Sequence, residues 1–328
     1  MKKLSVLAAG SLLLLFGCSK SVSDKEEEET TDALTRRCAS YEVLQAKLQE
    51  DPSLQKRMDE IEAFTARYVS QQRVAGKLEA DGVTMTIPVY VNVLYSTAAQ
   101  NISDQQIQSQ IDVLNEDYAG SNADVNKTNT YQTVKAGTTN IRFVLAGIIR
   151  KQTTVTSWGT NDAMKKTAQG GLDPTSPTTS LNMWSCNLGS GLLGYAQFPG
   201  GAAATDGVVI LYSAFGSRAK YPGGTYTSTY DLGRTATHEV GHWLNLRHIW
   251  GDRRCGDDLV GDTPAHDGAN YGCPAAGTIS KCAGKPVEMT MNYMDYTNDI
   301  CMYMFTAGQE TRMRATFAVG GPRAGLRP

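Results

Sequence analysis

Several scarcities narrow the class of protein before any motif is considered. The chain has almost no net charge, with 31 Lys and Arg against 33 Asp and Glu in 328 residues. Without a basic excess we expect no nucleic-acid partner, because such binding depends on neutralising phosphates. There are no internal repeats, and no long apolar run follows the first one, which excludes solenoids and membrane-spanning helices. A hydrophobic content of 41% excludes a disordered chain and predicts one large globular domain with attachments.

The single apolar run lies at the N-terminus, where Lys2 and Lys3 precede Leu4–Phe16. A membrane span needs about 20 apolar residues, so this shorter run indicates a signal peptide rather than an anchor. The run ends at Gly17-Cys18, which resembles a bacterial lipoprotein box. We therefore predict a lipoprotein signal over 1–18 with lipidated Cys18; the alternative is an ordinary secretory signal cut near Gly17.

The next two segments are charged and contain no core of their own. Residues 19–35 are polar and acidic, which predicts a solvated tether. Residues 36–72 are expected to be helical, with Asp51-Pro52 as a helix start. One helix face carries apolar residues at spacings of three and four: Leu54, Met58, Ile61, Phe64 and Tyr68. Such a segment must pack against something else.

From Val83 onward the pattern is that of an α/β (α+β) domain. The run from Val89 to Leu94 is typical of a strand that is covered on both faces. The other expected elements are a helix with a capping box at Ser103 and Gln106, strands at Ile141–Leu145, Leu181–Cys186 and Val208–Tyr212, a helix near Leu232–Leu244 capped by Asp231, and a closing helix after Thr306. Gly189–Gly201 is expected to be irregular.

Histidine is scarce as well, yet three of the four histidines fall within eleven residues. The string HEVGH at residues 238–242 puts His238 and His242 on one helix face, close enough to hold one ion. Glu239 is near enough to reach a metal-bound water without ligating the metal. Zinc lowers the pKa of such a water to about 7, and a carboxylate can then accept its proton. The sequence predicts a zinc site with Glu239 as general base.

The third histidine, His248, requires the helix to end before it. Asn245 stands where the longer zinc signature normally has glycine, and asparagine is the best substitute for glycine in the left-handed conformation. Three histidines and one open position are typical of a catalytic zinc site rather than a structural one.

These residues resemble a known family. The spacing H-E-x-x-H-x-x-N-x-x-H is similar to the metzincin signature, and MNYMDY at 291–296 resembles its Met-turn. The strings GLLGYAQFP at 191–199 and ATDGVV at 204–209 narrow the resemblance to the pappalysin family, cytophagalysin branch. It covers about residues 36–309.

The resemblance implies a metzincin-like zincin fold and a zinc endopeptidase. The expected fold has a twisted, mostly parallel five-stranded sheet, an active-site helix above the cleft, and an irregular, disulfide-linked lower subdomain. The family implies that Met294 lies beneath the metal and that Tyr296 stabilises the oxyanion. It also implies that 36–72 is a pro-segment and 73–328 the catalytic domain.

The cysteines allow several interpretations. Four in the tail allow three pairings, and spacing cannot choose among them. The resemblance implies Cys255–Cys282 and Cys273–Cys301. Cys186 lies in a predicted strand and is expected to be a buried free thiol.

Cys38 is the odd thiol of the helical segment. Its thiolate could fill the fourth zinc position and displace the catalytic water, with Arg36 and Arg37 favouring the thiolate. This resembles the cysteine switch of related zymogens; the alternative is a disulfide between Cys38 and Cys186. Activation is expected between Gln72 and Arg73, where the helical segment gives way to a polar connector.

Two further predictions concern acidic residues. Oxygen-bearing side chains crowd a short loop beside Cys255, namely Asp257, Asp258, Asp262 and Thr263. They suit a structural calcium ion, which the family favours, or form a solvated acidic turn. Asp299 lies five residues after Met294. By local sequence it is a surface residue in a polar turn. The resemblance implies instead that it is the acidic floor of a pocket that selects Arg or Lys after the cleaved bond.

Together these features predict an exported zinc endopeptidase made as a latent zymogen. We expect an outer-membrane or cell-surface lipoprotein, or a protein secreted after maturation, that meets membranes only through its lipid. Its expected partners are protein or peptide substrates and its own pro-segment, and we expect a monomer. Two alternatives remain: a non-catalytic surface lipoprotein with a structural zinc site, and a zinc hydrolase of small amides.

Overall fold

The computed structural model describes Met1 and residues 35–74, 83–127 and 129–327. The predicted signal peptide beyond Met1, with the lipidation site Cys18, and all but the last residue of the acidic tether lie outside the described residues. None of the described helices combines the length and the apolar character that crossing a membrane requires. The described chain from Thr35 onward is one compact unit.

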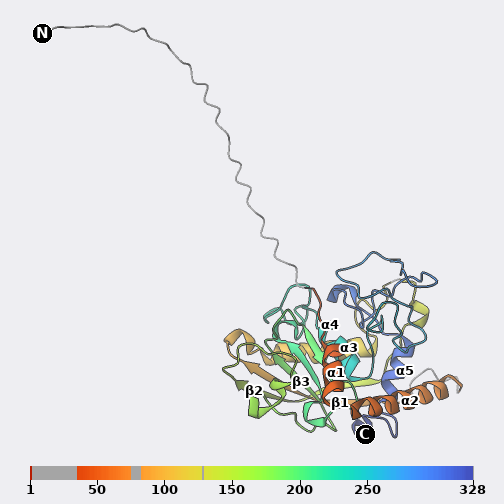
Figure 1. Cartoon of the computed structure of the whole chain (residues 1–328), viewed down its shortest axis with the longest axis horizontal. Coiled ribbons are helices and arrows are strands. Elements are labelled where there is room, and N and C mark those ends of the chain that lie inside the picture. The colour runs from red at the N-terminus through yellow and green to blue at the C-terminus, as the bar shows by residue number, and fades with distance from the viewer. Residues whose placement is uncertain (2–34, 75–82, 128, 328) are drawn as a thin grey trace. The chain divides into compact units, whose positions relative to one another are not determined.

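The unit is built on one five-stranded sheet (Figure 1). Its strands are β1 (Met85–Tyr95), β2 (Ile141–Gln152), β3 (Leu181–Cys186), β4 (Gly194–Ala196) and β5 (Val208–Leu211). They lie in the order β2-β1-β3-β5-β4, and every neighbouring pair is parallel except β4 with β5. Strands β3 and β5 are buried throughout, which explains why β5 is wholly apolar and β3 mostly so, with Asn182 and Ser185 as its polar residues. The predicted mostly parallel five-stranded sheet is confirmed.

Edge strand β4 corrects one prediction. The segment Gly189–Gly201 is not wholly irregular, because Gly194–Ala196 pairs antiparallel with β5. Gly194 serves close packing here rather than a turn: a Cβ at this position would come within 2.9 Å of both the Glu239 side chain and the Val209 carbonyl oxygen. The glycine therefore lets the helix that carries Glu239 lie directly against the strand.

Three helices of the body surround this sheet: α3 (Asp104–Ala119), α4 (Arg234–Trp243) and α5 (Ala307–Ala315). The predicted caps of α3 and α5 are present, since the Ser103 side chain accepts a hydrogen bond from Gln106 N and Thr306 forms a capping box with Gln309. Helix α3 packs against β2, and α4 packs against β4 and β5. The edge of the sheet thus presents β4 beside α4.

The predicted start of α4 is wrong. Asp231 does not cap it; its carboxylate pairs with Arg218 instead. The helix begins after Gly233, whose φ of 84° is the left-handed conformation that favours glycine. A carboxylate from distant Asp299 accepts the N–H groups of Leu232 and Arg234 at 2.9 and 3.2 Å. A residue 65 positions away therefore does what a local cap normally does.

The helical segment at the N-terminus consists of two helices, α1 (Ser40–Glu50) and α2 (Ser53–Val74), which break at Asp51-Pro52. Leu54 and Met58 of the predicted apolar face are buried against Phe198 of the body. The segment also contacts α5 through α2. Gln72 and Arg73 lie in the last turn of α2, so the helix continues past the predicted activation cut to Val74.

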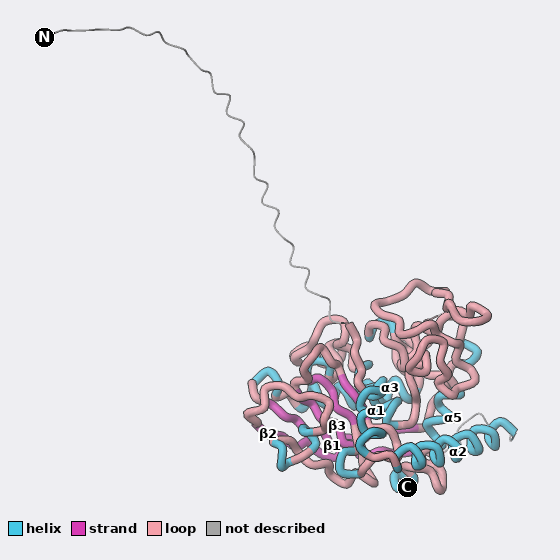
Figure 2. Tube along the Cα trace, in the orientation of Figure 1, coloured by secondary structure: helices cyan, strands magenta, loops and turns pink. Residues whose placement is uncertain are grey.

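Beyond α4 the chain is mostly loops (Figure 2). Disulfides Cys255–Cys282 and Cys273–Cys301 cross-link this region, with Cα–Cα distances of 5.6 and 5.8 Å. The closed loops interleave in sequence, so each disulfide restrains the loop that the other closes.

Candidate metal centre

Four potential metal ligands converge beside β4. Helix α4 carries His238 and His242, and the chain turns at Asn245, whose φ is 72°, to bring in His248. The Nε2 atom of His242 lies 3.1 Å from the Nε2 atoms of both other histidines. Zinc–nitrogen bonds of about 2.0–2.1 Å put tetrahedral ligands about 3.3 Å apart, so these imidazoles fit one zinc ion. The fourth group is the Cys38 thiol, and all four ligand atoms lie within 4.8 Å of one another.

The outer nitrogen of each imidazole is held by an acceptor. His238 Nδ1 bonds the carbonyl of Tyr293 at 2.7 Å, and His242 Nδ1 bonds that of Leu246 at 2.8 Å. Donation from Nδ1 leaves the Nε2 lone pair facing the centre, as a metal ligand requires. Burial, reinforced by the neighbouring imidazoles, lowers the pKa of both His238 and His242, which keeps them neutral.

The third histidine has an ionic partner that the sequence did not reveal. His248 Nδ1 forms a short hydrogen bond with the carboxylate of Asp252. A carboxylate behind a metal-ligating histidine orients the ring and raises its basicity. The signal available in the sequence was Gly251-Asp252, three and four residues after the histidine, a turn whose residues both have positive φ.

The Met-turn lies under the histidines. Met294 is fully buried, and a Cβ on Gly241 of α4 would lie 2.6 Å from its sulfur. The Tyr296 ring lies 4.9 Å from that of His248, and its hydroxyl donates to the Cys38 carbonyl at 3.1 Å. Met294 therefore supports the ligand helix, and the phenol faces the metal side.

Glu239 is buried next to the ligands. Burial raises its pKa to about 7, which suits a group that must accept and return a proton. Its carboxylate accepts hydrogen bonds from the Ser40 hydroxyl at 2.9 Å and the Cys38 thiol at 3.3 Å. The Glu239 carboxylate is therefore occupied by the N-terminal segment.

That segment pairs with β4 through an isolated bridge. Cys38 pairs in parallel with Gly194 of β4, through a hydrogen bond from Ala39 N to the Gly194 carbonyl at 3.1 Å. The Ser40 hydroxyl accepts the N–H of Ala196 at 2.8 Å. Cys38 and Cys186 are both free, so the alternative disulfide between them is wrong.

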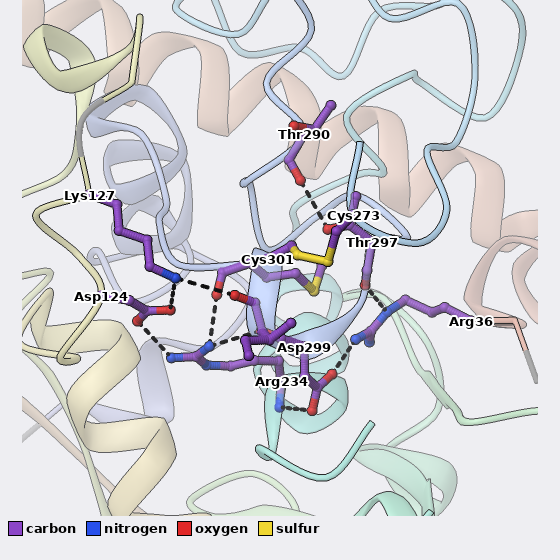
Figure 3. Close-up of a disulfide and its surroundings, with 11 residues drawn as sticks. Arg36, Asp124, Lys127, Arg234, Cys273, Thr290, Thr297, Asp299 and Cys301 are labelled. Carbon is purple, nitrogen blue, oxygen red and sulfur yellow. Dashed lines mark hydrogen bonds and ion pairs between the residues drawn. A yellow bond between two sulfur atoms is a disulfide. The ribbon is translucent and has the colours of Figure 1, made fainter. Parts of the chain in front are cut away.

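Asp299 lies next to this centre and is fully buried, so the interpretation as a surface residue is wrong. It forms an ion pair with Arg36, whose guanidinium also donates to the Thr297 carbonyl at 3.1 Å (Figure 3). The same guanidinium lies over the Tyr230 ring. A buried carboxylate needs such a partner. The family resemblance suggested an acidic pocket at Asp299, but the pairing of this carboxylate with Arg36 was not predicted.

The predicted calcium ligands do not converge on one point. Asp262 accepts hydrogen bonds from Thr306 and from Gly308 N in the first turn of α5. Asp258 is buried and bonds Thr263 at 2.8 Å, and burial raises its pKa to about 7. Asp257 bonds a backbone N–H in its own loop. Each carboxylate already has a protein donor.

Three imidazoles on a helix and a turn, a carboxylate beside the first, and a methionine beneath them define a zinc metallopeptidase of the metzincin class. The family model for Pregnancy-associated plasma protein-A matches residues 183–318. An extracellular metalloprotease of Pyricularia oryzae is 36% identical over 269 residues, covering 79% of this chain and 84% of the relative. The chain belongs to this peptidase family, and it is a zinc metalloendopeptidase.

Solved structures support the same assignment. Mature mirolysin of Tannerella forsythia in complex with a cleaved peptide is 45% identical, with a TM-score of 0.70, covering 75% of this chain and 96% of that one. A promirolysin mutant from the same organism is 40% identical with a TM-score of 0.78, covering 89% and 97%. The predicted family and fold class are confirmed.

Proposed function

We propose that the chain is the latent zymogen of an exported endopeptidase that cuts before Arg or Lys. One observation carries the proposal, and it concerns three residues of one short segment. Arg36 pairs with Asp299, the Cys38 sulfur lies within 4.8 Å of the ligand atoms of the three histidines, and the Ser40 hydroxyl donates to Glu239. The segment thus occupies the specificity residue, the metal ligands and the base together. Promirolysin, named as a proform, covers most of the chain, and the fungal relatives are named extracellular, which supports latency and export.

His238, His242 and His248 would hold the zinc, which supplies an acidified water and polarises the substrate carbonyl. Glu239 takes the proton of that water and returns it to the leaving amine. The Tyr296 hydroxyl donates to the oxygen that gains charge during attack. Met294 packs beneath the ligands without taking part in the chemistry.

Latency follows from the direction of the bound segment. A substrate with arginine after the cleaved bond runs from the metal toward Asp299. The pro-segment runs from Asp299, which pairs with Arg36, toward the three imidazoles, which lie beside Cys38. The pro-segment therefore occupies the same sites as a substrate but with the opposite chain direction, so none of its peptide bonds is aligned for cleavage.

Asp299 is proposed to select the residue after the cleaved bond. It is fully buried, and an isolated charge at such a site is costly unless a cation pairs with it. Its contact with Arg36 supports a guanidinium as the preferred occupant. The proposed cut between Gln72 and Arg73 has the same preference, so the enzyme could process its own precursor.

The boundaries and attachments are proposals too. The pro-segment would span 36–72 and the catalytic domain 73–328, with export as a lipoprotein through Cys18 or as a secreted monomer. A calcium ion near Asp257, Asp258 and Thr263 is supported by the buried carboxylate of Asp258. Its binding would have to turn Asp262 away from α5.

Digestion of denatured casein by the matured protein, with and without a zinc chelator, tests the activity. Chelator-sensitive cleavage is expected. A protein that cleaves only small amides, or nothing, would contradict the proposal. N-terminal sequencing of the matured form tests the cut before Arg73.

A further inference from the structure

Asp295 stands between the methionine of the Met-turn and Tyr296, and the reaction as described does not use it. Its carboxylate is fully buried. One oxygen accepts the N–H groups of Tyr296 and Asn270, both at 2.8 Å, and the other accepts the Asn270 side-chain amide at 3.0 Å. One carboxylate therefore ties the backbone of the catalytic tyrosine to a loop 25 residues earlier.

That loop, residues 266–271, is itself held in place by hydrogen bonds to Glu288 and Met289. Glu288 accepts the same Asn270 amide at 2.7 Å and the N–H of Asp267 at 2.9 Å. His266 Nε2 accepts the Met289 N–H at 2.9 Å, so the proton of the neutral ring sits on Nδ1. This buried Nδ1 has no hydrogen-bond partner among the described residues, and it lies 3.8 Å from the second oxygen of Asp295. Asp295 thus accepts two hydrogen bonds from Asn270 and faces the His266 ring of the same loop.

The loop also touches the tyrosine directly. Tyr271, next to Asn270, packs edge-on against the Tyr296 ring at 5.9 Å between centroids. The loop belongs to the segment closed by the disulfide Cys255–Cys282. The phenol is therefore fixed at two levels, its ring by an aromatic contact and its backbone by Asp295.

Removal of the pro-segment makes the backbone contact more important. In the latent chain the Tyr296 hydroxyl is held by the Cys38 carbonyl. Once the pro-segment leaves, this bond is lost and the bond from Tyr296 N to Asp295 remains. A hydroxyl misplaced by about 1 Å can cost about a hundredfold in rate.

We propose that Asp295 is a positioning residue that holds the Tyr296 hydroxyl at the place where the oxyanion forms, by clamping the Met-turn to the disulfide-closed loop. The inference rests on the proposed role of Tyr296. A carboxylate that only stabilised the fold would affect the tyrosine no more than any other part of the centre.

A double-mutant cycle separates these two roles. The variants Asp295→Asn, Tyr296→Phe and both together are made in the full exported chain and matured by a trace of tagged wild-type enzyme, which is then removed. Asparagine keeps an acceptor for Tyr296 N but turns a donor toward the Asn270 amide or His266. Asp267→Asn is the matched control, because this carboxylate lies in the same loop but pairs at the surface with Arg254 and Lys281.

The readouts are kcat and KM for a fluorogenic peptide with arginine after the cleaved bond, together with zinc content. We expect Asp295→Asn to lower kcat about tenfold or more, with KM changed less than about twofold. In the Tyr296→Phe background the same change should lower kcat less than about twofold, since the group it positions is gone. Asp267→Asn should behave as wild type.

Two results overturn different statements. An equal loss from Asp295→Asn in both backgrounds would show that it does not act through the phenol, and the positioning role would be wrong. Wild-type kcat in Tyr296→Phe would instead remove the proposed role of the tyrosine, and the positioning role with it. If Asp295→Asn yields no zinc-loaded protein, Asn270→Ser takes its place in the same cycle with the same expectations.

Discussion

The ion pair between Arg36 and Asp299 should set how tightly the zymogen is closed. Arg36→Ala removes the guanidinium and leaves a buried carboxylate without its charged partner. Breaking a buried pair in this way costs about 3–5 kcal/mol. Asp299 keeps two backbone donors, Leu232 N and Arg234 N, so the lower end of that range applies.

The open population is the fraction of uncleaved zymogen molecules whose pro-segment has left the metal centre. A loss of about 3 kcal/mol corresponds to roughly a hundredfold increase in this fraction, because each 1.4 kcal/mol is about tenfold. The matched control is Arg37→Ala. Arg37 is exposed and donates only to the Ser190 carbonyl in the hydrogen bonds described, so its loss should change the open population less than about threefold.

The open population can be measured as the initial rate of peptide hydrolysis by uncleaved zymogen. The chain carries Arg73→Ala to block the proposed activation cut, and electrophoresis verifies that it stays intact. Cys38→Ala, which removes the thiol from the metal ligands, is the positive control.

Equal initial rates for Arg36→Ala and Arg37→Ala would refute the reasoning. The buried pair would then contribute nothing to closure, and latency would depend on Cys38 and Ser40 alone. A hundredfold difference would establish that the Arg36–Asp299 ion pair contributes to latency in addition to Cys38 and Ser40.

Four further predictions concern the centre and its surroundings. Glu239→Ala should keep zinc, by metal analysis, but lose peptidase activity by several orders of magnitude; a tenth of wild-type turnover would mean another base. Asp299→Ala should lose the preference for Arg or Lys after the cleaved bond while general proteolysis survives, as read by mass spectrometry of peptides from a mixed proteome. Glu62→Ala breaks an ion pair between α2 and a buried arginine of α5 and should speed activation, whereas Glu60→Ala, in an exposed pair on α2, should not. Burial raises the pKa of Asp258 to about 7 in the folded chain without calcium, whereas an unfolded Asp has a pKa of about 3.9, so the stability of the fold falls as pH rises from about 4 to 7. Calcium binds the ionised carboxylate, so added calcium should raise the thermal midpoint more at pH 8 than at pH 5. No change at either pH would remove the proposed site.

The parts of the centre that local rules govern could be predicted. The spacing of His238 and His242 fixes a shared helix face, and Asn245 adopts the left-handed turn expected of it. Strands β3 and β5 were predicted close to their observed bounds, and both are short, largely apolar segments that are buried throughout. The family resemblance supplied the Met-turn, which spacing alone does not identify.

The parts that failed depend on contacts between distant segments. Strand β4 was missed because glycine normally weakens a strand, whereas here Gly194 makes room for a side chain of α4. The cap of α4 was assigned to Asp231, its nearest carboxylate in sequence, but Asp299 provides it. Arg36 pairs with a residue 263 positions away, which no local pattern encodes.

Helix α2 has a kinetic consequence for activation. Its 22 residues span about 33 Å at 1.5 Å per residue, with Leu54 and Met58 packed near the start and Arg73 in the last turn. If activation requires a cut before Arg73, a zymogen molecule cannot make that cut itself while Arg36 and Cys38 occupy its own centre. A second enzyme molecule, whose pro-segment has already left the centre, must then cut it. Activation then becomes a bimolecular, self-accelerating process with a lag that shortens as concentration rises. Zymogen molecules at low concentration would remain latent, whereas molecules concentrated on one surface would be activated rapidly after a short lag.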